Sequence, residues 1–189
     1  MALKRKNREA TREISKAVLE MVSVAGFVTL AGLASNGYKA DKLFIGLAGY
    51  GINRIRETIK RLKFQGVLEY DEEDENCPIV LSSKGMTRLT RHRIFSLFSE
   101  HEKWDHFWRM LLFDIPEHCC RRRRSFQMAL KRAGLYRLQD SVYITPYDRK
   151  EQLILLAKLY GVAPHILIAT TTSLGPFEKE ARKFFFQKS

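Results

Sequence analysis

Cysteine is scarce in this chain of 189 residues, which has only Cys77, Cys119 and Cys120. An odd number of cysteines without CxxC spacing argues against a disulfide framework, and the spacing fits no zinc site. This usage is typical of proteins from a reducing compartment. We therefore expect a cytoplasmic location and no metal held by these cysteines.

Long apolar runs are also lacking. An uncharged stretch covers residues 21–38, but serines, a threonine, an asparagine and three glycines interrupt it. A transmembrane helix needs about 20 clearly apolar residues. We therefore expect no membrane span, and we interpret the stretch as a buried helix broken at Gly26. The basic start at residues 4–6 is followed by Glu9 and Glu13, which is not the pattern of a signal peptide. We expect residues 1–9 to be frayed and a helix to begin near Ala10.

Several enzyme motifs are missing as well, since the chain has no Walker loop, no GxGxxG and no nucleophile elbow. Positive charge, by contrast, is abundant. Lysine and arginine number 33 against 21 acidic residues, which gives a net charge of +12. A soluble chain this basic favours a polyanionic partner, with nucleic acid as the first choice and an anionic membrane surface as the competitor.

The clearest amphipathic pattern of the N-terminal half covers residues 52–65. Apolar residues recur there at three- and four-residue steps, which predicts a helix with one buried stripe. Gly66 follows as the residue that ends the helix. The other side is mostly basic and carries Asn53, Arg54, Arg56, Glu57, Lys60, Arg61 and Lys63. A second helix over residues 42–48 precedes it, so the pair predicts a helix-turn-helix.

Two short strand patterns follow this basic helix, at residues 67–70 and 79–81, and a helix is expected over residues 86–98. A basic helix followed directly by a hairpin predicts a winged helix. The hairpin tip, residues 71–75, consists of five consecutive acids, which phosphates would repel. We interpret the tip as a solvated turn. Docking of the tip onto the basic helix is the alternative.

The C-terminal half predicts a β-α-β-β-α-β order, which is that of a ferredoxin-like sandwich. A final helix over residues 176–186 ends in three phenylalanines, which the sheet or a second chain must cover. The expected fold class is therefore α+β. The expected domains are a winged helix-turn-helix over residues 1–98, a linker over residues 99–107 and a ferredoxin-like domain over residues 108–189.

One combination of motifs in this half is specific. The segment FDIPE at residues 113–117 precedes an arginine-rich helix that Gly134 stops, and LQDSV at residues 138–142 and Thr145-Pro146 follow. The combination resembles the central domain of PaaX-type transcriptional repressors, which is itself similar to the small CRISPR adaptation nucleases. With the upstream half included, the resemblance to PaaX-like proteins covers nearly the whole chain. The resemblance to the nucleases begins only at about Trp108.

Asp114 is the candidate catalytic residue, because the resemblance to the nucleases implies a metal-binding aspartate at this point. One carboxylate cannot hold and use Mg²⁺ alone, so a two-fold dimer would have to bring two copies together. The alternative is structural. Asp114 and Glu117 have the spacing of a capping box, and Pro116 is tolerated in a first helical turn.

The arginine run is a candidate for phosphate contacts and consists of Arg121, Arg122, Arg123 and Arg124. Positive charge near a helix N-terminus opposes the helix dipole, so local stability does not require this placement. Pairing with acids across a dimer and a simple solvated face are the alternatives. Four consecutive residues point around the whole helix, so they cannot all contact one ligand.

The sequence therefore favours a double-stranded DNA-binding transcriptional regulator, a repressor by resemblance, that acts as a homodimer without a cofactor. In this hypothesis Asn53, Arg54, Glu57 and Thr58 face base edges, and Lys60, Arg61 and Lys63 hold phosphates. The alternative is a Mg²⁺-dependent endonuclease or CRISPR-adaptation protein that uses Asp114 at a dimer interface. A protein-interaction module is a third reading.

Overall fold

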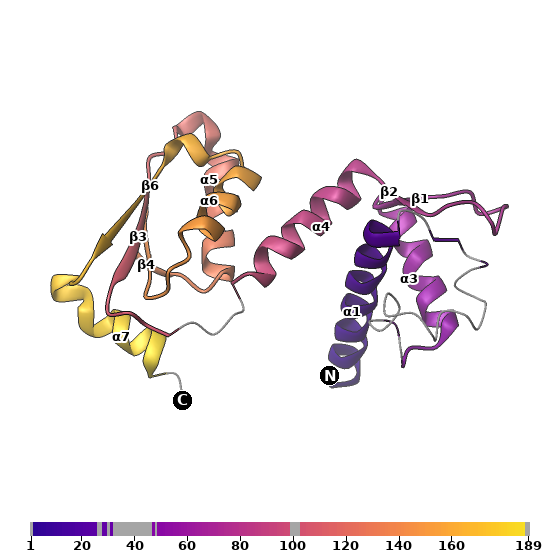
Figure 1. Ribbon diagram of the computed structural model, residues 1–189, viewed down its shortest axis with the longest axis horizontal. Helices are drawn as coiled ribbons and strands as arrows, with labels where there is room; N and C mark the ends of the chain where they lie inside the picture. The colour runs from indigo at the N-terminus through magenta and orange to yellow at the C-terminus, as the bar shows by residue number, and fades with distance from the viewer. Residues whose placement is uncertain are drawn as a thin grey trace. The chain divides into compact units, whose positions relative to one another are not determined.

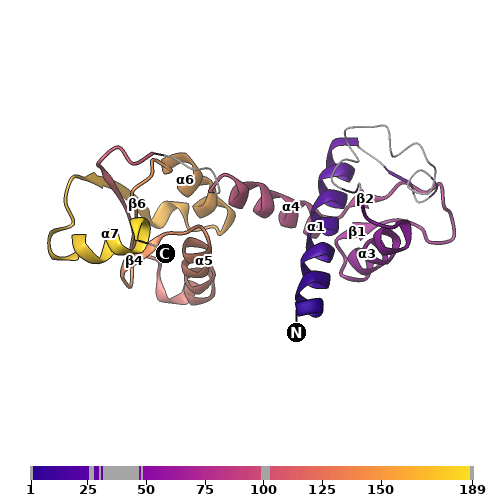
Figure 2. The ribbon, with the colours of Figure 1, turned by 90° about the horizontal axis from the view of Figure 1, so that it is seen from below.

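The structure is a computed structural model that describes residues 2–25, 28–29, 31, 47, 49–98 and 103–187. The chain divides into two compact units, Met1–His92 and Arg93–Ser189. Figures 1 and 2 show their elements. Apart from Leu47, the helix expected over residues 42–48 lies outside the described residues, as do residues 99–102 of the expected linker.

The first unit is built from helices and a small two-stranded sheet. Its elements are α1 (Ala2–Ala25), α3 (Ile52–Phe64), β1 (Leu68–Glu69), β2 (Val80–Leu81) and the start of α4 (Ser83–Ser96). The strands pair antiparallel. The apolar stripe of α3 packs in one core with α1, as Ile55, Ile59, Ile14 and Val18 are each at most 1% exposed. Gly66 has a φ of +66° after α3, which confirms its predicted place at the helix end.

Helix α1 is longer than the sequence pattern indicated, since it begins at Ala2 and not near Ala10. Helix α4 also begins earlier than expected, at Ser83 and not at Met86. The hydroxyl of Ser82 accepts a hydrogen bond from the Gly85 amide at 3.0 Å, which is an N-terminal cap. Because Ser82 is the cap, residues 83–85, which lie before the expected start of the helix, form its first turn.

The second unit contains a four-stranded antiparallel sheet with the order β4-β5-β3-β6. Its elements in chain order are β3 (Trp108–Phe113), α5 (Cys120–Arg132), β4 (Tyr136–Gln139), β5 (Val142–Thr145), α6 (Lys150–Leu159), β6 (Ile166–Thr171) and α7 (Glu178–Phe186). Short 3₁₀ turns at Glu117–Cys119, Ala163–His165 and Gly175–Phe177 precede α5, β6 and α7. The observed fold class is α+β, as predicted.

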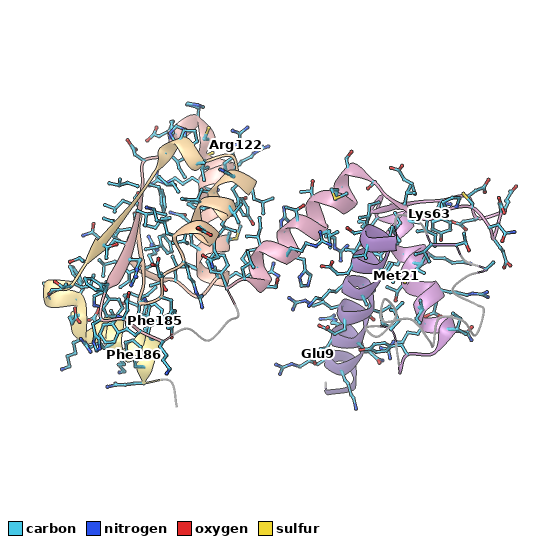
Figure 3. The ribbon with its side chains drawn as sticks, viewed as in Figure 1. Glu9, Met21, Lys63, Arg122, Phe185 and Phe186 are labelled. Carbon is cyan, nitrogen blue, oxygen red and sulfur yellow. The ribbon has the colours of Figure 1, made fainter. Side chains whose placement is uncertain are left out.

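The two faces of this sheet carry different cores, because side chains alternate along each strand. On β3, Leu111 and Phe113 pack in a cluster with α5 and α6, whereas Trp108 and Met110 pack in a second cluster with α7. The ring of Phe185 on α7 lies 5.9 Å from that of Trp108 (Figure 3). Phe186 stays 43% exposed, so the sheet covers the three phenylalanines only in part.

None of the helices within the described residues is long and apolar enough to cross a membrane.

Candidate nucleic-acid interface

Helix α3 presents a polar face on the first unit. Its apolar stripe is fixed in the core, which turns the remaining positions outward. Asn53, Glu57, Lys60 and Arg61 are exposed, and Arg54, Arg56 and Lys63 are half-buried. Most of the residues that the sequence proposed for DNA contact therefore share one accessible side of α3.

The N-terminal half of α1 lies against part of this face and forms a groove of about 540 Å³ with it. Asn7 and Thr11 line the groove from α1, and Asn53, Arg54, Glu57, Thr58 and Arg61 line it from α3. Arg54 Nη2 donates to the carbonyl oxygen of Asn7 at 3.2 Å and to its Oδ1 at 3.1 Å. Arg61 Nη2 donates to Ser15 Oγ at 3.2 Å. Both guanidinium groups are thus held by α1.

Thr58 differs from the other proposed contact residues, because it is only 3% exposed. Its hydroxyl donates to the carbonyl oxygen of Arg54, one helical turn earlier, at 2.9 Å. Such a bond satisfies the hydroxyl proton of a threonine inside a helix. Thr58 is therefore almost wholly buried beneath the groove, which argues against its expected place at a base edge.

Lys63 is engaged by the acidic hairpin tip. Its Nζ lies 3.0 Å from Glu72 Oε1 and 4.7 Å from the centre of the Tyr70 ring. Burial, and secondarily the charge of Glu72, raises the pKa of Tyr70. An ion pair this exposed contributes at most about 1 kcal/mol, so a phosphate could compete for Lys63.

All five tip residues are exposed, and two of their side chains accept hydrogen bonds from nearby backbone amides. Asp71 Oδ1 accepts a hydrogen bond from the Glu73 amide, and Asp74 Oδ1 accepts one from the Asn76 amide. These are local turns of the kind that aspartate favours. The turns at Asp71 and Asp74 therefore fit the solvated-turn interpretation, whereas the ion pair of Glu72 with Lys63 is a contact that the docking alternative expects.

The sequence did not predict that α1 contributes residues to the candidate interface. Its first turns expose Arg5, Lys6, Arg8 and Arg12 next to the groove residue Asn7. The expectation of a frayed end is wrong for residues 2–9, which belong to a segment of 25 residues without glycine or proline that is rich in good helix formers. This composition could have predicted that the helix begins near the first residues.

Asp114 is exposed at the end of β3, where its backbone amide donates to the carbonyl oxygen of His165 at 3.0 Å. It borders a groove of about 520 Å³ whose other lining is largely apolar, with Ser141 and His165 as polar members. Within the described residues, no three His, Cys, Asp or Glu side chains gather as a metal site.

The capping-box alternative for Asp114 is wrong. The 3₁₀ turn before α5 has Pro116 at its N-cap, and α5 itself has Cys119, in each case without a side-chain capping bond. Asp114 lies two residues before Pro116, too early to cap either helix. The FDIPE spacing alone could not show where the first turn begins.

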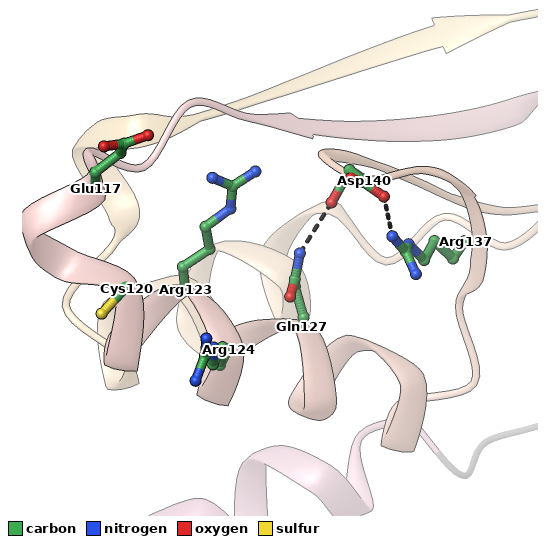
Figure 4. A pocket seen from close by; sticks show the side chains of 7 residues that line it. All are labelled: Glu117, Cys120, Arg123, Arg124, Gln127, Arg137 and Asp140. Atoms are coloured by element: carbon green, nitrogen blue, oxygen red, sulfur yellow. Dashed lines mark hydrogen bonds and ion pairs between the residues drawn. The ribbon is translucent and has the colours of Figure 1, made fainter.

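The four arginines spread around α5 as expected. Arg121, Arg122 and Arg124 are exposed, and Arg123 is half-buried and donates to Ser141 Oγ at 3.1 Å. Figure 3 labels Arg122, and Figure 4 shows that Arg123 and Arg124 line a pocket.

Comparison with known proteins identifies the second unit. A family model described as the PaaX protein central Cas2-like domain matches residues 101–182. No curated protein matches the chain. The match confirms the resemblance inferred from the FDIPE segment and the residues after it. Residues 101–182 therefore belong to the PaaX central, Cas2-like domain family.

Proposed function

We propose that this protein is a transcriptional regulator that binds double-stranded DNA as a homodimer. Membership of the second unit in the PaaX family suggests a transcriptional regulator. The observation that carries the DNA-binding step is the accessible, mainly basic face of α3 beside a hairpin in the first unit. The net charge of +12 supports the same partner.

The first unit supports a winged-helix assignment. Helix α3 is followed by the antiparallel pair β1 and β2 and then by α4, and Val28 forms an isolated bridge with Ile79 next to β2. In winged and other helix-turn-helix folds, the recognition helix enters the major groove with its N-terminal residues at base edges. In this proposal α3 is that helix. The β-α-β-β-α-β order of the second unit supports the ferredoxin-like assignment.

The residues of α3 divide by position. Asn53, Arg54 and Glu57 lie in its first half and are proposed to read bases. Lys60, Arg61 and Lys63 lie in its second half and are proposed to hold phosphates. Thr58 supports the helix from within the core and makes no DNA contact in this scheme.

The second unit offers a surface for the homodimer. On the sheet face that α7 covers in part, Leu112 is the register partner of both Val142 and Leu167. Leu112 and Val142 are half-buried, and Leu167 is 64% exposed. A row of apolar side chains across an open sheet face favours self-association, and two-fold dimers are the commonest form.

The test is a labelled duplex carrying the gene's own upstream region, compared with a scrambled duplex in the presence of Mg²⁺. We expect a shift on a native gel that prefers the native sequence, with intact strands on a denaturing gel. Arg54→Ala should weaken binding and relax the preference. Lys60→Ala should weaken binding to both duplexes and lower the salt slope by about one. Lys179→Ala on α7 removes the same charge elsewhere and should leave binding unchanged.

Other outcomes would overturn the proposal in identifiable ways. Cleavage that disappears in Asp114→Ala would establish the nuclease alternative. Absence of any shift at low salt would leave a protein-interaction module. Equal effects of Lys60→Ala and Lys179→Ala would show that binding depends on total charge and not on α3.

A further inference from the structure

A pocket of about 540 Å³ lies between α5 and the β4–β5 turn of the second unit (Figure 4). Cys120, Arg123, Arg124 and Gln127 line it from α5, and Arg137 and Asp140 line it from β4 and the turn. The α5 residues are spaced i, i+3, i+4 and i+7, so they share one helix face. Of the four consecutive arginines, Arg123 and Arg124 therefore line this pocket.

The three guanidinium groups of the pocket differ in their partners. Arg137 forms an ion pair with Asp140. Arg123 is bonded to the neutral hydroxyl of Ser141 at 3.1 Å. Arg124 makes no hydrogen bond or ion pair with the part of the chain that the structure describes. Two cations from the same helix face thus enter the pocket without a carboxylate partner.

The wall opposite α5 is held in place by one bond from α5 and one ion pair of its own. Gln127 Nε2 donates to the Asp140 carbonyl oxygen at 3.0 Å, and the Arg137–Asp140 pair closes the same turn. Glu117, the other acid of the lining, lies at the opposite end of the pocket in Figure 4, with Arg123 and Arg124 between. The middle of the pocket is therefore its positive part.

Stability does not explain this arrangement. Each cation in the first turns of a helix opposes the helix dipole, and neighbouring guanidinium groups repel one another. An anion between Arg123 and Arg124 would remove both costs. Guanidinium groups match the several acceptor oxygens of a phosphate, which they bind by paired hydrogen bonds.

We propose that this pocket binds a phosphate group through Arg123 and Arg124, with Arg137 and Gln127 positioned at its edge. A phosphorylated small molecule and the DNA backbone share this chemistry. The site lies apart in sequence from α3 and does not depend on the DNA-reading role proposed for that helix.

The test uses pyrophosphate as the probe and isothermal titration calorimetry of the full chain at constant ionic strength. Arg124→Gln is the main variant, because it removes no described bond of the folded chain. Arg123→Gln is the second, with circular dichroism as its folding control. Arg121→Gln is the matched control, since it removes the same charge from the same helix outside the pocket. We expect both pocket variants to bind pyrophosphate at least about tenfold more weakly, and the control within about twofold.

A measurement of DNA affinity in the same variants distinguishes the two sources of phosphate. If the ligand is a small molecule, DNA affinity will be the same in Arg124→Gln and Arg121→Gln. If it is the DNA backbone, DNA affinity will fall in Arg124→Gln but not in Arg121→Gln, and pyrophosphate will compete. Equal behaviour of the three variants in both arms, or no pyrophosphate binding with unchanged DNA affinity in Arg124→Gln, would overturn the proposal. The calorimetry still tests the phosphate pocket even if the protein binds no DNA.

Discussion

Gly85 and Ser82 decide how α4 begins. A Cβ atom on Gly85 would lie 2.2 Å from the carbonyl oxygen of Val67, which is backbone and cannot swing away. The hydroxyl of Ser82 donates to the Gly66 carbonyl oxygen at 2.7 Å while it accepts from the Gly85 amide. The first turn of α4 is therefore locked against the segment that leads into β1, and glycine is required there by space and not by φ.

Gly85→Ala should destabilise the protein by about 1–3 kcal/mol, although alanine is the better helix former by about 1 kcal/mol. The cost arises because α4 or the β1 segment must move to make room. Urea unfolding followed by circular dichroism measures it. Gly51→Ala is the control, since a Cβ there meets nothing within 4 Å and its φ is −65°. Equal stability of Gly85→Ala and the wild type would show that the contact is not close in solution.

Arg109 is a buried cation that depends on a carboxylate. Its side chain is 7% exposed and makes two hydrogen bonds with Asp105, at 2.5 and 2.6 Å. Asp148 lies 3.2 Å away as a second partner. The hydrogen bonds from Arg109 lower the pKa of Asp105 from 3.8 to about 2. Because folding lowers this pKa, the ionised carboxylate stabilises the folded state above about pH 4, and this contribution is lost as the pH falls towards 2.

Asp105→Asn should therefore lower the Tm at pH 7, and its difference from the wild type should shrink between pH 4 and pH 2. Tryptophan fluorescence is the suitable signal, since both tryptophans, Trp104 and Trp108, are close to Asp105 in sequence. Asp148→Asn removes the more distant and 68% exposed partner, so its effect should be smaller. A difference that stays constant down to pH 2 would contradict the role of the ionised carboxylate.

At the scale of elements, helices and strands with a clear apolar period could be predicted, and elements set by contacts could not. Helix α3 and the β-α-β-β-α-β order follow from spacing and from the stops at Gly66 and Gly134. The early start of α1 was missed because its first two turns carry no apolar stripe. The first turn of α4 was missed because it depends on the contact of Gly85 with the Val67 backbone, which no local pattern records.

The candidate interface likewise has features that the sequence could predict and features that depend on tertiary contacts. The amphipathic period gave the correct polar side of α3, yet it could not separate Thr58 from its exposed neighbours, because a threonine at that position is compatible with either environment. It also could not show that Arg54 reaches Asn7, 47 residues earlier. Partners this distant in sequence become known only when the two helices are packed together.

The bonds between Arg54 and Asn7 lead to a prediction for the pair α1 and α3. In the proposed function Arg54 reads bases, and Asn7 limits the positions of its guanidinium group. Asn7→Ala should therefore weaken binding to the native duplex by about threefold to tenfold, the value of one hydrogen bond, and lower the preference over a scrambled duplex. Asn76→Ala, the same substitution at an exposed residue directly after the hairpin tip, is the control. A loss of affinity that is equal for both duplexes would assign Asn7 a role in general stability only.

At the scale of the whole molecule, the open face of the four-stranded sheet carries an exposed apolar row. Leu167, Leu112 and Val142 stand in one register row across three strands, and α7 shields other positions of that face. A solitary exposed leucine needs no explanation, whereas a row of three across a sheet is an apolar patch. The proposed homodimer gives this patch a partner of the same composition.

Leu167→Lys should then dissociate the dimer, because a charge would be buried without a partner at the centre of the interface. We expect the dimer dissociation constant, measured by sedimentation equilibrium, to rise at least about 30-fold, the effect of a central interface residue. Folding should be preserved, since Leu167 is 64% exposed within one chain. Leu155→Lys on α6 places the same charge at a leucine that is 41% exposed outside the patch, and it should leave the dimer intact. A monomeric wild type, or equal dissociation in the two variants, would exclude this face as the dimer interface.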